Sequence, residues 1–457
     1  MLIRLACALL LPLLLAGCAA SSVLTPYPAQ ALHYRNALDA GTPAAALARI
    51  GRKTASADAT LYLLEKGRVA QLAGAADASR EAFAAVIDRL AQQDERAVIS
   101  ASSYAASGAS LLTNDNARPY QGRVYERVFV HQYQALNYLA AGDLQGALVE
   151  VRRANQLQTE ALRAQEGRVD KAQAEAAAKG LDTARYDAYF SAMELAAGRV
   201  KSGFQNAATF YLSGLIYEAG GLPNDAYIDY RKALELVPAN TFLQKDVLRT
   251  GLAAGIDEIR MLAKQHGTLQ GGPRPGEGEL VVYLEEGFVP AKQPVAIPIW
   301  TTTTLNHVSF PLYGEARAPA PMVLQVDGQE VETGPLVDTR ALAVRTLKDE
   351  TPALLARAFL RLLTRQQMQR QARSHDSSGL LGLASTLYSL VTEQPDLRSW
   401  LTLPGSGQVL RLALPAGEHS LSRPGMPPLS ITVRPGRPTL VHLVALPGKT
   451  YSRIYPL

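Results

Sequence analysis

Two hydrophobic periodicities divide the chain. Up to about residue 265, apolar residues recur at helical spacing, whereas from residue 280 onward short apolar runs alternate with turns rich in glycine and proline. The first pattern is typical of amphipathic helices and the second of short β-strands. We therefore predict an α + β, multidomain chain, with helices over 31–265 and a β-rich domain over 280–457. Residues 266–279 contain five glycines and two prolines and are predicted to be a linker.

The spacing of glycines indicates a repeat in the helical part. Gly41, Gly74, Gly108 and Gly142 lie 33, 34 and 34 residues apart, and Gly221 follows 79 residues later, which corresponds to one repeat plus an insert of 45 residues. A period of 34 residues is typical of tetratricopeptide repeats, which are helix-turn-helix units. The helical part is therefore predicted to be a tetratricopeptide-like α-solenoid. The alternative is an alanine-rich helical bundle in which the glycine spacing is accidental.

Side chains around the turn glycines fit such a repeat. A small residue is needed where two paired helices approach closely, and a larger residue of the second helix fills the space beside it. Cap residues followed by a first helical turn mark starts of second helices at Thr42-Pro43 and Asp143. In three units the small residue and the larger residue are Gly67 and Phe83, Ala135 and Val151, and Gly214 and Tyr230.

Other helical segments depart from the repeat. The third unit should keep a first helix at Arg96–Ala106, but Thr113–Gly122 contains Asn, Asp and Pro and is predicted to be a loop. The insert Gln158–Asn206 is rich in Ala, Glu, Lys and Arg and predicts a long helical hairpin that turns near Gly180. Thr241–Gln265 predicts a terminal helix that covers the last repeat.

Repeat arrays curve, and the first helix of each unit lines the concave side. The positions three before, one after and four after the small residue should therefore line a groove. This groove mixes apolar and polar side chains and suits a peptide or a protein segment, although simple packing would also explain each residue. The predicted groove residues are Leu64, Arg68 and Gln71, then Gln132, Leu136 and Leu139, then Tyr211, Leu215 and Glu218.

The β-rich part predicts a small β-sandwich-like domain with a helical insert at about 337–395. Asp327-Gly328 between two apolar runs is a two-residue hairpin signal. Within the insert, Thr351-Pro352 should begin a helix that runs to about Arg373, and a second helix is expected at Leu380–Thr392. The predicted strands are Leu280–Leu284, Val295–Trp300, His307–Leu312, Met322–Val326, Val409–Leu414, Leu429–Val433 and Leu440–Val444.

An arginine row accompanies the first helix of this insert. Arg357, Arg361 and Arg365 repeat every four residues, while Leu355, Phe359, Leu362 and Leu363 fall on another face. One interpretation is a helix packed on the sheet with a solvated arginine row. The other is a basic face that binds anionic lipid or a cell-envelope polymer.

The N-terminus carries an export signal. Residues 1–17 comprise a start with Arg4, an apolar run from Leu5 to Leu15 and small residues before Cys18. The run is shorter than the roughly 20 apolar residues that a membrane span needs. Leu15-Ala16-Gly17-Cys18 resembles the lipobox of bacterial lipoproteins, which implies lipid on Cys18, cleavage before it, and a tether at 18–30. The alternative is an ordinary secretory peptide with a chance cysteine.

Composition and charge argue against several classes of site. The only other cysteine, Cys7, leaves with the signal, so the mature chain can form no internal disulfide and has no cysteine cluster for zinc or iron–sulfur binding. The content of 47% hydrophobic and 19% charged residues is that of a globular protein, and a net charge of +5 gives no case for nucleic-acid binding.

The sequence contains no evident catalytic constellation. None of the seven histidines is paired with another ligand at useful helical spacing, and neither a Gly-x-Ser-x-Gly elbow nor a phosphate loop occurs. Glu285 and Glu286 are neighbours on a strand and are interpreted as surface charges on opposite faces. We expect no enzyme activity, cofactor or metal. The alternative is a hydrolase in the β-rich half, with His307 or His442 in a pocket beside a carboxylate and a hydroxyl.

Several stretches of the chain resemble known protein families. The segments 111–155, Phe210–Glu218 and Asp396–Trp400 resemble a poorly characterised family of proteobacterial repeat lipoproteins, and 414–419 with the strands after it resembles the PEGA-type β module. That family has no established activity to transfer, and its members are often encoded near a lipoprotein that activates a penicillin-binding protein, which suggests a role in the cell envelope. Ala19 resembles the sorting pattern for the outer membrane. We therefore expect a lipid-anchored periplasmic scaffold that binds an envelope protein or peptide through the groove.

Overall fold

The computed structural model describes most of the chain from Thr25 onward. Residues 1–24, which include the predicted signal peptide and Cys18, lie outside the described part, as do Gly108 and the predicted helix Leu380–Thr392. The side chain of Arg365 is also outside it. The described residues are 25–102, 116, 118–165, 167–178, 180–266, 272–300, 305–375 and 394–457.

Packed helical pairs make up the first half. In four pairs the two helices are joined by a short turn that contains Gly41, Gly74, Gly142 or Gly221, with φ between 70° and 79°. This left-handed conformation favours glycine because it has no Cβ. The predicted turns are therefore confirmed at these four positions. The pairs are α3 (Tyr27–Asp39) with α4 (Pro43–Gly51), α5 (Ala59–Leu72) with α6 (Ala76–Ser102), α8 (Val124–Ala140) with α9 (Leu144–Gln165), and α13 (Ala207–Ala219) with α14 (Pro223–Leu236).

Close approach explains the small residues of the first helices. A Cβ added to Gly67 of α5 would lie 2.5 Å from the Phe83 ring of α6, and one added to Gly214 of α13 would lie 2.7 Å from Tyr230 of α14. The expected pairing of a small residue with a large one is confirmed in these two units. The predicted starts of the second helices are also confirmed. Pro43 is the first residue of α4. Asp143 immediately precedes α9, and its carboxylate accepts a hydrogen bond from the Gly146 backbone N–H at 2.8 Å.

Three helix predictions were wrong. Arg96–Ser102 continues α6 instead of starting a new helix, since neither glycine nor proline interrupts 76–102. The terminal helix is divided into α15 (Thr241–Ala253) and α16 (Asp257–His266), because Gly255 between them has φ 76°. The insert turns at Gly180 as predicted but is no long hairpin. It consists of α10 (Arg168–Ala178) and short segments η4 (Thr183–Tyr186), α11 (Asp187–Phe190), η5 (Ser191–Met193) and α12 (Glu194–Ala197).

The strands form three sheets. A five-stranded sheet has the order β11-β10-β1-β7-β6, in which β1 and β10 are parallel and the other neighbours are antiparallel. A four-stranded sheet has the order β5-β4-β8-β9, and β2 and β3 form a separate pair. The strands are β1 (Glu277–Glu286), β2 (Gln293–Trp300), β3 (Leu305–Leu312), β4 (Val323–Val326), β5 (Gln329–Glu332), β6 (Gly334–Asp338), β7 (Ser406–Pro415), β8 (Gly417–Arg423), β9 (Met426–Val433), β10 (Pro438–Ala445) and β11 (Thr450–Pro456).

These strands contain the predicted ones, apart from Met322, which precedes β4. The hairpin prediction is confirmed, because Asp327 and Gly328 connect β4 to β5 with φ 51° and 80°.

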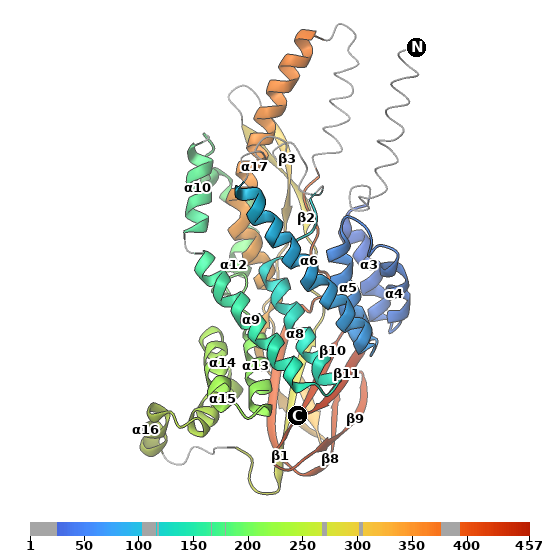
Figure 1. The fold of residues 1–457 in the computed structure, drawn as a ribbon, viewed down its shortest axis with the longest axis vertical. Helices are drawn as coiled ribbons and strands as arrows, with labels where there is room; N and C mark the ends of the chain where they lie inside the picture. The colour runs from blue at the N-terminus through green and yellow to red at the C-terminus, as the bar shows by residue number, and fades with distance from the viewer. Residues whose placement is uncertain are drawn as a thin grey trace.

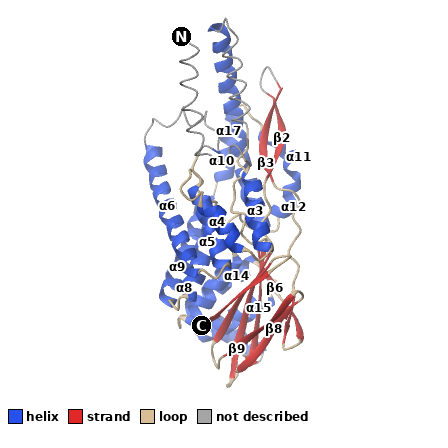
Figure 2. Cartoon of the chain, turned by 90° about the vertical axis from the view of Figure 1, so that its right-hand side faces the viewer, coloured by secondary structure: helices blue, strands red, loops and turns tan. Residues whose placement is uncertain are grey.

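The central strand β1 is buried on both faces. Its alternate residues Leu280, Val282 and Leu284 share a hydrophobic core with the four-stranded sheet. Val281 and Tyr283 point the other way and belong to a core shared with the helices. The protein therefore has three layers, in which helices cover one face of the five-stranded sheet and the four-stranded sheet covers the other (Figures 1 and 2). The predicted sandwich-like packing of two sheets is present.

The helical and β-rich halves share one core. A single cluster of buried side chains extends from Tyr27 in α3 to Tyr455 in β11. Strand β1 already begins at Glu277, within the predicted linker. At the other end, α3 begins at Tyr27, and both Tyr27 and Gln30 are buried, so the predicted tether 18–30 is too long.

The helix of the insert also differs from its prediction. Helix α17 spans Thr339–His375, so it begins twelve residues before Thr351, and Pro352 lies inside it. Proline removes one backbone donor from a helix, and next to it the Thr351 hydroxyl donates to the Leu347 carbonyl at 2.9 Å. Within the described part of the chain, no helix combines the length and apolarity that crossing a membrane requires.

Candidate functional site

The predicted groove residues lie on the first helices of their pairs, but they face the chain's own sheet. The expectation of an open groove is wrong for this structure, because the five-stranded sheet and the segment that leads into β7 fill the space. Leu139 and Glu218 are half-buried. The remaining groove residues are buried: Leu64, Arg68, Gln71, Gln132, Leu136, Tyr211 and Leu215.

A buried ion pair joins Arg68 of α5 to Glu285 of β1 in this interface. Arg68 also donates to the Gln71 side-chain oxygen at 2.7 Å and lies 4.3 Å from the centre of the Tyr133 ring. The Tyr133 hydroxyl donates to Glu285 at 2.8 Å. Glu285 is fully buried, so its interpretation as a surface charge was wrong.

The environment of Glu285 decides its charge. Burial alone would raise the pKa of this carboxyl group, but the nearby Arg68 and His442 side chains and the Tyr133 hydroxyl lower it to about 2. Glu285 is therefore ionised at neutral pH, and its charge is compensated within the interface.

The groove glutamines are also satisfied internally. The Gln71 amide donates to the Asn137 side chain at 3.1 Å and to the Tyr133 backbone carbonyl at 3.2 Å. The Gln132 amide nitrogen donates to the Tyr283 hydroxyl of β1 at 3.2 Å, and its oxygen accepts from Thr209 at 2.6 Å. These side chains have no need of an external ligand for their hydrogen bonds.

A second ionic cluster joins the last helical pair to the sheet. Arg411 of β7 is buried and pairs with Glu218 of α13 at 2.9 Å and with Glu279 of β1 at 2.6 Å. Arg249 of α15 also pairs with Glu218, and it contacts Asp246 at 3.0 Å. Burial would raise the pKa of Glu218, but the two guanidinium groups hold it at about 2.

An extended segment before β7 lies against the helices and is held through its backbone. The Trp400 N–H donates to the Glu126 carboxylate of α8 at 2.8 Å, and the Leu401 N–H donates to the Glu65 carboxylate of α5 at 2.9 Å. Thr402 also donates to Glu65 through its hydroxyl. Both carboxylates are fully buried. Side chains on two successive helical pairs thus bind the backbone of one extended segment.

Side chains of the same segment also contact the helical half. Arg398 is buried, pairs with Asp58 and with Asp396, and donates to the Arg118 carbonyl at 2.9 Å. The Trp400 ring is fully buried, with its centre 5.7 Å from that of Phe83. The segment Asp396–Trp400, which the sequence marked only by resemblance, therefore connects the two halves.

The sequence reasoning missed Glu65 and Glu126. A signal was present, because each stands on the apolar side of its helix. Glu65 has Leu61 four residues before it and Val69 four residues after it, and Glu126 has Val130 four residues after it. An acidic residue at such a position has to find buried partners.

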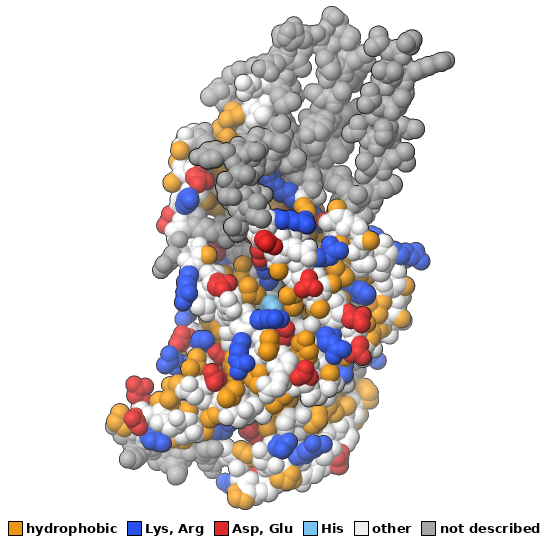
Figure 3. Space-filling view, in the orientation of Figure 1, with side chains coloured by type: hydrophobic (Ala, Val, Ile, Leu, Met, Phe, Trp, Pro, Cys, Tyr) orange, Lys and Arg blue, Asp and Glu red, His pale blue; other side chains and the backbone are white. Residues whose placement is uncertain are grey.

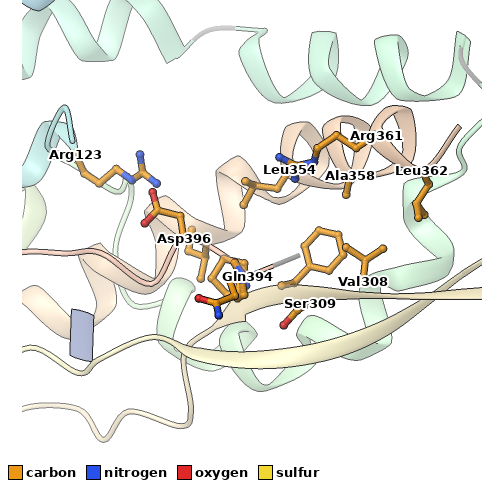
Figure 4. Close-up of a pocket in the computed structure, with 13 residues that line it drawn as sticks. Arg123, Val308, Ser309, Leu354, Ala358, Arg361, Leu362, Gln394 and Asp396 are labelled. Atoms are coloured by element: carbon orange, nitrogen blue, oxygen red, sulfur yellow. The ribbon is translucent and has the colours of Figure 1, made fainter. Parts of the chain in front are cut away.

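The arginine row is not a fully solvated face. Arg357 and Arg361 are half-buried. Arg361 lines a cavity of about 50 Å³ between α17 and β3, with Val308 on the opposite wall (Figure 4). Arg123 and Asp396 face one another at one end of this cavity. The cavity is small and mixes apolar with charged walls.

The three groups named in the hydrolase alternative meet around His442, which is buried. His442 lies 3.2 Å from Glu285 and its ring stacks on that of Tyr283 at 5.3 Å. Only 4% of His442 is exposed, so a substrate could reach it only by separating the layers. His307 is exposed on β3. Within the described ranges, no three His, Cys, Asp or Glu side chains are grouped to hold a metal ion.

The helical side of the molecule carries both signs of charge. Figure 3 shows lysine and arginine side chains interspersed with acidic and hydrophobic ones over this face. Such a surface differs from the continuous basic patch that nucleic-acid binding requires.

Comparisons with models of protein families, with curated proteins and with solved structures find no match for this chain.

Proposed function

We propose that this chain is a lipid-anchored scaffold of the bacterial cell envelope. Lipid on Cys18 would hold it at the outer membrane, facing the periplasm. Its helical pairs would be tetratricopeptide-type units that clamp the chain's own C-terminal half. A protein partner would then bind to the outer surfaces of this combined body.

One observation carries the proposal. Glu65 and Glu126, on the first helices of two units, accept hydrogen bonds from consecutive backbone N–H groups of one extended segment. Repeat arrays use their first helices in this way to bind extended chains. The proposal is supported by the spacing of Gly41, Gly74 and Gly142, which are 33 and 68 residues apart (one period and two periods), and by the tight packing of Gly67 on Phe83.

Because the chain itself fills the concave side, a partner has to use another face. Leu195 on α12 is 86% exposed and is the most exposed large hydrophobic residue described. Val149 of α9 and Ile228 of α14 lie on outer helix surfaces, with 44% and 37% exposure. These positions are suitable for detecting a partner.

The test is site-specific photocrosslinking in intact cells. A photoreactive residue at position 195, 149 or 228 should give a reproducible adduct with one envelope protein. The same residue at position 215 is the matched control, because Leu215 is fully buried and should give none. Failure of all three outer positions to trap an envelope protein, with the fold intact, would contradict the scaffold proposal. An adduct from position 215 would show that the groove opens in the cell.

The lipid anchor has an independent test. Mass spectrometry of the purified chain should find an acylated N-terminal cysteine at position 18. The Cys18→Ser variant should lose the acyl group and accumulate as a precursor. An unmodified Cys18 in the mature chain would contradict the anchor without affecting the crosslinking result.

A further inference from the structure

The β2–β3 hairpin exposes two large hydrophobic side chains next to one another. Trp300, the last residue of β2, is paired directly with Leu305, the first residue of β3. Their exposed fractions are 68% and 42%. The other tryptophan, Trp400, is fully buried. A tryptophan ring left exposed at a strand end is therefore a feature that packing among the described residues does not explain.

This hairpin lies beside helix α17. Both project toward the same end of the long axis, away from β8 and β9 (Figures 1 and 2), and residues of β3 and α17 line a common cavity. From Thr351 to His375, α17 has no acidic residue. The same 25 residues carry five arginines: Arg357, Arg361, Arg365, Arg370 and Arg373.

The tether keeps the folded body close to a membrane if Cys18 is lipidated, so this step rests on the proposed function. Helix α3 begins at Tyr27, whose side chain is buried. Nine residues separate Cys18 from Tyr27, and a fully extended chain of that length spans at most about 31 Å. Some face of the body must therefore lie near the lipid surface.

We propose that the end formed by the β2–β3 hairpin and the C-terminal part of α17 docks on an anionic phospholipid bilayer. Trp300 and Leu305 enter the headgroup region, where tryptophan is favoured because its ring has an apolar body and a polar N–H. The positive charge of Thr351–His375, which has no acidic residue to offset it, attracts anionic lipids, by about 1 kcal/mol for each basic residue near the surface. A lipid chain combined with this second contact fixes the orientation of the scaffold as well as its location.

The two tryptophans allow a direct test. The acylated full-length chain is placed on vesicles of phosphatidylcholine and phosphatidylglycerol that contain brominated acyl chains, which quench tryptophan at short range. We expect a blue shift and loss of the Trp300 emission. In Trp300→Phe, only the buried Trp400 remains, and its emission should be unchanged by brominated lipid. Higher salt, or vesicles of phosphatidylcholine alone, should weaken the quenching of Trp300.

A matched surface variant distinguishes membrane docking from the effect of removing any exposed apolar side chain. Val323→Ser removes a 40% exposed side chain from β4, in the four-stranded sheet, and should leave the quenching unchanged. Leu305→Ser should reduce it. If Trp300 of an acylated, vesicle-bound chain keeps its emission and stays accessible to acrylamide, the docking proposal is overturned. Protection from acrylamide that requires another envelope protein instead of brominated lipid would assign this end to a protein partner and would also overturn it. If the purified chain carries no acyl group, the lipid anchor is contradicted. Quenching of Trp300 by brominated vesicles then still tests the docking proposal by itself.

Discussion

Arg68 and Glu285 are 217 residues apart in the sequence and form an ion pair in which neither side chain is more than 1% exposed. Arg68 lies in the middle of helix α5, and Glu285 lies on the central strand of the sheet. The pair therefore connects the inner side of the helices to the core of the β-rich half. A side chain that was predicted to line a ligand-binding groove instead contacts the chain's own C-terminal half.

Breaking this pair should destabilise the whole protein. Arg68→Met leaves the Glu285 carboxylate buried without its counter-ion. Glu285→Leu likewise leaves the Arg68 guanidinium buried without its counter-ion. Each should lower the free energy of unfolding by about 3–5 kcal/mol. The double variant should lose much less than the sum, because neither charge remains. Urea unfolding of the four chains measures the coupling.

An exposed pair provides the control. Arg185 and Asp182 form a surface ion pair with side-chain exposures of 79% and 58%. Arg185→Ala should change the stability by about 0–1 kcal/mol. Additive effects of the two buried substitutions would mean that Arg68 and Glu285 do not act as a pair.

The same carboxylate should give a defined acid dependence. The pKa of Glu285 is about 2 in the folded chain, where Arg68 outweighs the effect of burial, against about 4.3 in an unfolded chain. A lowered pKa in the folded state contributes stability above the unfolded pKa, and this contribution is lost as the pH falls toward the folded pKa. The difference in unfolding free energy between the wild type and Glu285→Gln should be constant from pH 5 to 7. It should shrink between about pH 4.5 and pH 2.

Measuring the difference between two chains is essential here. Burial raises the pKa of Glu65 and of Asp246, so these groups shape the total acid profile in the opposite direction. Their contribution cancels when the wild type and the variant are compared at each pH. A gap that stays constant down to pH 2 would contradict an ionised Glu285 with a lowered pKa.

The sequence predicted the elements whose rules are local. Gly74 and Gly142 stand at turns because the turn needs positive φ, and that requirement shows directly in their spacing. Asp327-Gly328 is similar, since a two-residue hairpin limits the residues that can form it. The boundaries of α6 and α17 differ from their predictions, because α6 continues through Arg96 to Ser102 and α17 begins at Thr339, twelve residues before Thr351.

The contents of the groove could not be predicted from local patterns. Arg68 and Gln132 were placed correctly on the inner helices, but their partners lie far along the chain on β1. Glu285 looked like a surface charge because a strand alternates its faces and one face is usually wet. Here helices cover that face, so the alternation placed Glu285 in the interior.

A methyl group at the closest helix approach should be costly. Gly67→Ala would place a Cβ 2.5 Å from the Phe83 ring, and the packed core around Phe83 leaves little room for it to move. We expect a loss of about 1–3 kcal/mol in unfolding free energy, typical of overpacking. Gly51→Ala is the matched control, because it also lies in a helix but has no heavy atom within 4 Å of the added Cβ. It should be neutral or stabilising by up to about 1 kcal/mol. Equal effects of the two substitutions would contradict the close approach of α5 and α6.

The final prediction concerns the extended segment held by the helices. Glu126 accepts hydrogen bonds from the Trp400 N–H at 2.8 Å and from the Arg123 N–H at 2.6 Å. Glu126→Ala leaves buried donors without a partner, and each costs about 1–3 kcal/mol. The segment should loosen, so Trp400 should become more accessible to acrylamide. In a Trp300→Phe background, Trp400 is the only tryptophan, and its quenching reports on this segment alone.

The matched control for Glu126→Ala is Glu330→Ala, which removes an exposed carboxylate from β5 and should change neither stability nor quenching. Two measurements distinguish loosening from unfolding. Circular dichroism should keep its helical signal below the unfolding transition while the quenching of Trp400 rises. If Trp400 stays inaccessible and the stability is unchanged, the backbone contact with Glu126 does not hold the segment, because the donors left without Glu126 would have to show in at least one of the measurements.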